Sequence, residues 1–160
     1  MRGQWHKWGA IFYILWGILH IGLGGLLLYR LGTHGGVAAV SLIGTAVPPA
    51  DLPQQLPGVV SGVIGQHGWN LILLGIFALV VGIAGNWRNS LLGYWLNLCV
   101  VSAADIGFIF AIVVPRYNTL FDGLAGPILW VSAAIFSTIG IVQRKRRVSA
   151  TFASLPLNVS

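Results

Sequence analysis

The amino-acid sequence predicts an all-α integral membrane protein with four transmembrane helices in an antiparallel up-down bundle. Of its 160 residues, 56% are hydrophobic and 8% are charged, and the mean hydropathy is +0.84. Ordinary soluble domains are about one quarter charged. The chain also contains four apolar runs of membrane-spanning length, with basic residues at their ends.

Each apolar run is bounded by charged residues or by turn-forming residues. The first follows a basic N-terminal segment, but it is longer than the apolar part of a signal peptide, so we expect an uncleaved helix. The runs predict helices at residues 8–29, 69–85, 91–114 and 126–142, within one transmembrane domain at residues 1–147, followed by a cytoplasmic tail at residues 148–160.

A long apolar outer loop, residues 31–68, is predicted between the first two helices. It is rich in glycine and small apolar residues, and prolines gather at residues 47–53. A structureless connection of this length is uncommon, so we expect short helices near residues 37–43 and from Pro57 onward. Because the loop is too apolar for a solvated linker, we expect it to lie on the bundle mouth or the membrane interface.

The basic residues predict the orientation of the helices. Seven would lie on one side of the membrane and two on the other, which places both termini in the cytoplasm. The expected location is a cell membrane of the bacterial cytoplasmic type. The seven are Arg2, Lys7, Arg88, Arg144, Lys145, Arg146 and Arg147, and the two are Arg30 and Arg116.

Several function classes find no support in the sequence. The net charge of +6 comes from basic residues that act as topology signals, so no nucleic-acid partner is expected. Glutamate is absent and only three aspartates occur, which leaves few groups for acid–base chemistry. The four histidines form no pair at metal-ligand spacing, so no metal site is predicted, and no motif identifies a cofactor. Cys99 is the only cysteine and cannot form an intrachain disulfide.

Asp105 is the exceptional residue because it lies near the middle of the third apolar run. A charged side chain at bilayer depth costs about 2.5–3.5 kcal/mol, so it should face the bundle and find a partner. Helical rise places His20 about 18 Å along the first helix and Asp105 about 21 Å along the third, which is the same layer. We therefore predict that the two side chains meet directly or through one water. Ser132, about 9 Å inside the outer end of the fourth helix, would reach this layer too.

Two interpretations of His20 and Asp105 remain open. In the first, they form a catalytic acid–base pair in which the carboxylate fixes the imidazole tautomer. In the second, they form a polar clamp between helices. Interhelical hydrogen bonds in membranes contribute only around 0.6 kcal/mol on average, which is a weak reason to keep a carboxylate there.

Other polar and aromatic residues are candidates for ligand binding. Tyr13 and Trp16 precede His20 on nearly the same side of the first helix, while Asn97 and Thr138 would form a second, inner layer. Aromatic residues beside a polar spot suit a lipid-like or planar ligand, although such stripes also serve packing. With Ser132, these residues complete the predicted ligand-binding set.

The sequence is compatible with three functions. The first is a binding or accessory subunit for a lipid-like ligand or partner membrane helices, in a homo-oligomer or a larger membrane complex. The second is a membrane-embedded enzyme that acts on an apolar substrate through His20 and Asp105. The third is an oligomeric transporter or channel subunit, since four helices alone give little room for a pore.

Overall fold

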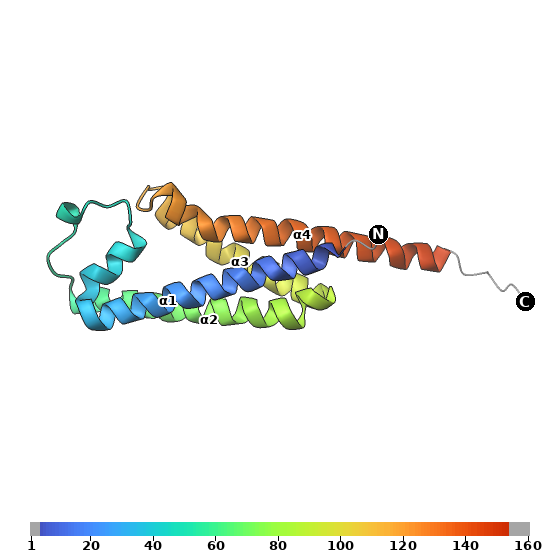
Figure 1. Cartoon of the computed structure of the whole chain (residues 1–160), viewed down its shortest axis with the longest axis horizontal. Helices are drawn as coiled ribbons and strands as arrows, with labels where there is room; N and C mark the ends of the chain where they lie inside the picture. Colours follow the sequence, from blue (N-terminus) through green and yellow to red (C-terminus); the bar gives the residue numbers. More distant parts are fainter. Residues whose placement is uncertain (1–3, 154–160) are drawn as a thin grey trace, which may run out of the picture.

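The computed structural model describes residues 4–153, which contain helices and turns and no strand. Four helical segments in this part of the chain are long and apolar enough to cross a membrane, which supports a membrane protein. They lie side by side along the long axis of the molecule (Figure 1). The four long helices are α1 (Trp5–Ile43), α2 (Gly58–Ala84), α3 (Leu91–Phe108) and α4 (Leu120–Ala153).

Helix α1 extends well beyond the predicted 8–29 segment because the residues after it kink the helix without ending it. Gly35 adopts φ 81°, in the left-handed region that favours glycine. The chain turns there, and residues 36–43 fold back against the outer parts of α1 and α2; here outer means the end of the bundle opposite the start of α1, and inner the other end (Figure 1). Ala39 packs on Leu27 and Ile64 in this small cluster.

The predicted loop of residues 31–68 is therefore helical at both ends. Its helical segments near residues 37–43 and from Pro57 onward were expected, and Pro57 is the N-cap residue of α2. Between them lie a short turn of 3-10 helix, η1 (Pro49–Asp51), and irregular chain.

The two later helices also differ from the predicted bounds. Helix α3 starts at Leu91 as expected, with the Ser90 side chain accepting the Gly93 N–H, but it passes into a π-helical turn, η3 (Ile109–Val113). Helix α4 begins at Leu120, earlier than the predicted residue 126, because Thr119 caps it. The Thr119 hydroxyl accepts the Asp122 N–H at 3.3 Å and donates to Asp122 Oδ2 at 2.7 Å.

Glycines allow α1 to lie very close to α2. A Cβ added to Gly17 would be 2.6 Å from the Gly75 carbonyl oxygen, and one added to Gly24 would be 2.6 Å from the Gly68 carbonyl oxygen. Only residues without a side chain permit this approach of two backbones. The contact continues toward the start of α1, where a Cβ added to Gly82 of α2 would lie 3.1 Å from Ile14 Cγ1.

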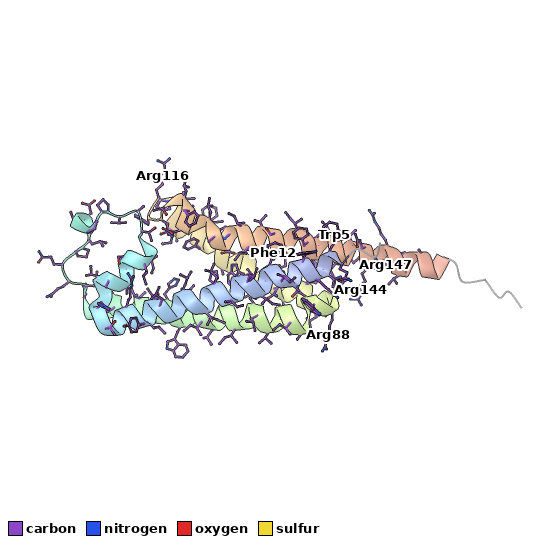
Figure 2. The ribbon with its side chains drawn as sticks, viewed as in Figure 1. Trp5, Phe12, Arg88, Arg116, Arg144 and Arg147 are labelled. Carbon is purple, nitrogen blue, oxygen red and sulfur yellow. The ribbon has the colours of Figure 1, made fainter. Side chains whose placement is uncertain are left out.

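The inner half of α1 also packs against α4. Phe136 stacks on both Trp5 and Phe12, with ring centroids 5.6 Å apart in each pair. A Cβ on Gly9 would collide with Ser137, and a Cβ on Gly140 would lie 2.7 Å from His6 Cβ. Figure 2 shows Trp5 and Phe12 along this contact. Helix α1 is thus the element that α2 and α4 share.

We predict that Gly75→Ala destabilises the protein. The new Cβ would lie 2.6 Å from the Gly17 carbonyl oxygen and 2.9 Å from the Ile21 nitrogen, so the helices must separate. Overpacking of this kind costs about 1–3 kcal/mol. The thermal midpoint in detergent, followed by tryptophan fluorescence, should fall.

Gly22→Ala is the matched control because a Cβ at Gly22 meets nothing within 4 Å. Alanine is also the better helix former. An equal loss of stability in both variants would mean that α1 and α2 are not in close contact.

Candidate functional site

A large cavity of about 830 Å³ lies among α1, α2, α3, η3 and α4, in the outer half of the molecule. Its lining is mainly apolar. Figure 1 shows the α3–α4 end diverging from the α1–α2 end on the side away from the chain termini. The innermost lining residues of the four helices are Leu19, Leu74, Ala104 and Pro127.

The outer end of the cavity is crossed by a strap, which we define as residues 44–47 bonded to residues 117–119. The Thr45 hydroxyl donates to Asn118 Oδ1 at 2.7 Å, and the Ala46 N–H donates to the Tyr117 carbonyl at 3.0 Å. The Thr119 N–H in turn donates to the Thr45 hydroxyl at 3.1 Å. These bonds join the end of α1 to the turn before α4.

His20 and Asp105 lie together at the closed, inner end of the cavity. Both side chains border Gly126 of α4: a Cβ added there would be 3.3 Å from Asp105 Oδ1 and 3.4 Å from His20 Cε1. All three residues line the cavity. The two side chains, which were predicted to share one layer, therefore both lie next to the same residue of α4.

The hydrogen-bond partner of Asp105 is Trp16. The Trp16 Nε1–H donates to Asp105 Oδ2 at 2.8 Å, and Asp105 is only 2% exposed. No direct hydrogen bond joins His20 to Asp105 in the described residues. Instead His20 stacks on Trp16, with ring centroids 3.6 Å apart, so the indole ring connects the two side chains.

The hydrogen bonding of His20 determines what its ring offers to the cavity. Its Nδ1 lies 2.9 Å from the Trp16 carbonyl oxygen. A carbonyl can only accept, so Nδ1 must carry the hydrogen. In the neutral imidazole, Nε2 is then an acceptor, and it lies on the Gly126 side of the ring.

The other predicted ligand-binding residues do not line this cavity. Tyr13 and Trp16 are fully buried in the core cluster with Ala78, Val101 and Ala133. Ser132 is half-buried and makes no hydrogen bond with the described residues. Its predicted place beside His20 and Asp105 is taken by Gly126.

Asn97 and Thr138 belong to separate hydrogen-bonded pairs. The side-chain amides of Asn97 and Asn86 lie 2.9 Å apart in the core, near the end of α2. Thr138 contacts the Tyr94 hydroxyl at 3.1 Å and donates to the Ala134 carbonyl. Both pairs therefore join helices in the inner half, away from the cavity.

Five polar residues that line the cavity were not predicted as site residues: Thr45, His67, Asn70, Asn118 and Asp122. His67 and Asn70 of α2 line the cavity farther out than His20. They lie within the segment that the sequence assigns partly to the outer loop, so their helical face could not be determined. A helix predicted to run from Pro57 through Asn70 would have placed His67 and Asn70 on the same helix.

We predict that Asp105→Asn is better tolerated than Asp105→Leu. Asparagine can still accept the Trp16 N–H, whereas leucine leaves this buried donor without a partner, at a cost of about 1–3 kcal/mol. The free energy of unfolding in detergent should differ by that amount between the variants. Asp51→Asn and Asp51→Leu, at an exposed position, should be indistinguishable, and equal losses at Asp105 would contradict the role of Trp16.

The cavity and its lining carry the functional argument, because fold similarity alone would not establish function. No family model, curated protein or solved structure matches the chain.

Proposed function

We propose that the chain is a non-catalytic, four-pass membrane protein that binds a lipid-like molecule in its outer cavity. The observation that carries the proposal is the cavity itself. Its volume of about 830 Å³ falls within the usual range of roughly 300–1,000 Å³ for small-molecule sites. Its lining is mainly apolar, and His20 and Asp105 at the closed end would contact the polar end of an amphiphile that points inward.

Entry from the membrane is consistent with the surface around the cavity. Val63 and Phe121 line it and are 60% and 91% exposed. The strap of Thr45 and Asn118 covers the outer end. An apolar molecule would therefore reach the cavity between helices, from the surrounding acyl chains.

The proposed topology is an antiparallel up-down bundle with both termini in the cytoplasm. Arg88 and Arg144 lie at one end of the molecule and Arg116 at the other (Figure 2). Arg144 donates to the Asn89 carbonyl at 2.7 Å, which joins α4 to the turn after α2. The uneven distribution of basic residues favours this end as the cytoplasmic one. The cavity then lies in the outer half of the bilayer.

Binding is favoured over catalysis by the partners of the two candidate catalytic residues. The enzyme interpretation has the Asp105 carboxylate fixing the His20 tautomer, but Trp16 donates to one carboxylate oxygen and a backbone carbonyl holds the His20 Nδ1–H. Each group thus has a structural partner. The enzyme interpretation, the partner-helix interpretation and the oligomeric transporter or channel remain predictions from the sequence.

We predict that filling the cavity prevents binding. Ala111→Phe places an aromatic ring where η3 lines the cavity, whereas Ala103→Phe adds the same ring at an exposed position outside it. Native mass spectrometry of the purified protein with 1-hexadecanol should show about tenfold weaker binding, or 1.4 kcal/mol, for Ala111→Phe alone. Equal binding by both variants would contradict a site in this cavity.

The orientation can be tested by cysteine labelling in intact cells. With Cys99 replaced by serine, we expect an impermeant maleimide to label Tyr117→Cys in the outer turn. Ser149→Cys, near the end of α4, should react only after the cells are opened. Labelling in the reverse order would exclude the proposed topology.

A further inference from the structure

We infer that the cavity selects ligands whose polar end is a hydrogen-bond donor, an amine or a hydroxyl, and disfavours an anionic head group. This inference rests on the proposed function and names the class of ligand. It depends on the charges that line the cavity and on the two acceptors at its closed end.

The charge of the lining disfavours anions. Asp105 and Asp122 line the cavity, and no lysine or arginine is among the described residues that do so. A carboxylate or phosphate bound there would lose its hydration without gaining a lysine or arginine partner. An ammonium group at the closed end would instead approach a carboxylate.

The closed end presents two acceptors. The Trp16 N–H occupies Asp105 Oδ2, while Oδ1 points toward Gly126 and receives no hydrogen bond from the described residues. His20 Nε2 is the second acceptor because Nδ1 holds the hydrogen. A ligand that donates hydrogen bonds would satisfy both atoms.

Asp105 gives the closed end of the cavity a polar group that a ligand can contact. Asp105 is only 2% exposed, yet its Oδ1 receives no hydrogen bond from the described residues. Oδ1 keeps accessible surface at the cavity, so a ligand that covers this oxygen without donating to it would leave a buried acceptor unpaired. Gly126 contributes by leaving open the space that a methyl group would fill, 3.3 Å from Oδ1.

The test uses four probes with the same sixteen-carbon chain: hexadecylamine, 1-hexadecanol, methyl hexadecanoate and hexadecanoate. Their Kd values for the full chain in detergent would be measured by native mass spectrometry. We expect the amine and the alcohol to bind at least about tenfold more tightly than the ester, which only accepts hydrogen bonds, and than the anion.

The outcomes separate the two proposals. Binding of hexadecanoate or the methyl ester as tightly as the alcohol would overturn the donor selectivity and leave the lipid-binding function standing. If none of the four probes binds, the proposed function itself fails.

Two variants locate the selectivity. Asp105→Asn should weaken the binding of hexadecylamine about tenfold more than that of 1-hexadecanol, because it removes the negative charge and keeps hydrogen-bonding capacity. Gly126→Ala should weaken both donors by placing a methyl group between the acceptors. Asp51→Asn, which removes an exposed carboxylate outside the cavity, should bind all four probes as the unmodified protein does. If the ratio of the hexadecylamine and 1-hexadecanol Kd values is unchanged in Asp105→Asn, the assignment of the selectivity to Asp105 is overturned.

Discussion

The hydrogen bond between Trp16 and Asp105 fixes the relation between α1 and α3. A buried carboxylate needs a hydrogen-bond donor, and the indole Nε1–H supplies one at 2.8 Å. The bond can form only when both side chains face the interior at the same level. The same indole ring then supports the His20 imidazole by stacking, so one aromatic side chain positions both polar groups at the closed end of the cavity.

Small residues determine where the helices separate. Gly17 and Gly24 bring α1 against α2 in the outer half, whereas Gly9 brings α1 against α4 in the inner half. Helix α1 thus keeps α2 as a neighbour in the inner half, where Gly82 faces Ile14, and has α4 as a second neighbour there. Where α4 is no longer held against α1, the space among the helices opens into the cavity, and the strap at Thr45 and Asn118 closes its far end.

The number of spanning helices could be predicted because apolar length and sparse charge have few alternatives in a bilayer. The helix ends were harder to predict. Gly35 permits a kink where a loop was expected, and the Thr119–Asp122 cap starts α4 early. Helical rise was enough to predict one layer for His20 and Asp105, but the pairing of Asp105 with Trp16 depends on the rotation of two helices about their axes. That rotation is set by interhelical packing, which one sequence does not reveal.

The position of Asp105 also explains why its two oxygens differ. Oδ1 receives no hydrogen bond from the described residues, but it keeps accessible surface at the cavity, so it is not an enclosed unpaired atom. Here Trp16 satisfies Oδ2 from the core side, and Gly126 provides no side chain on the cavity side. Oδ1 therefore faces the end of the cavity where the polar group of a ligand would donate a hydrogen bond to it.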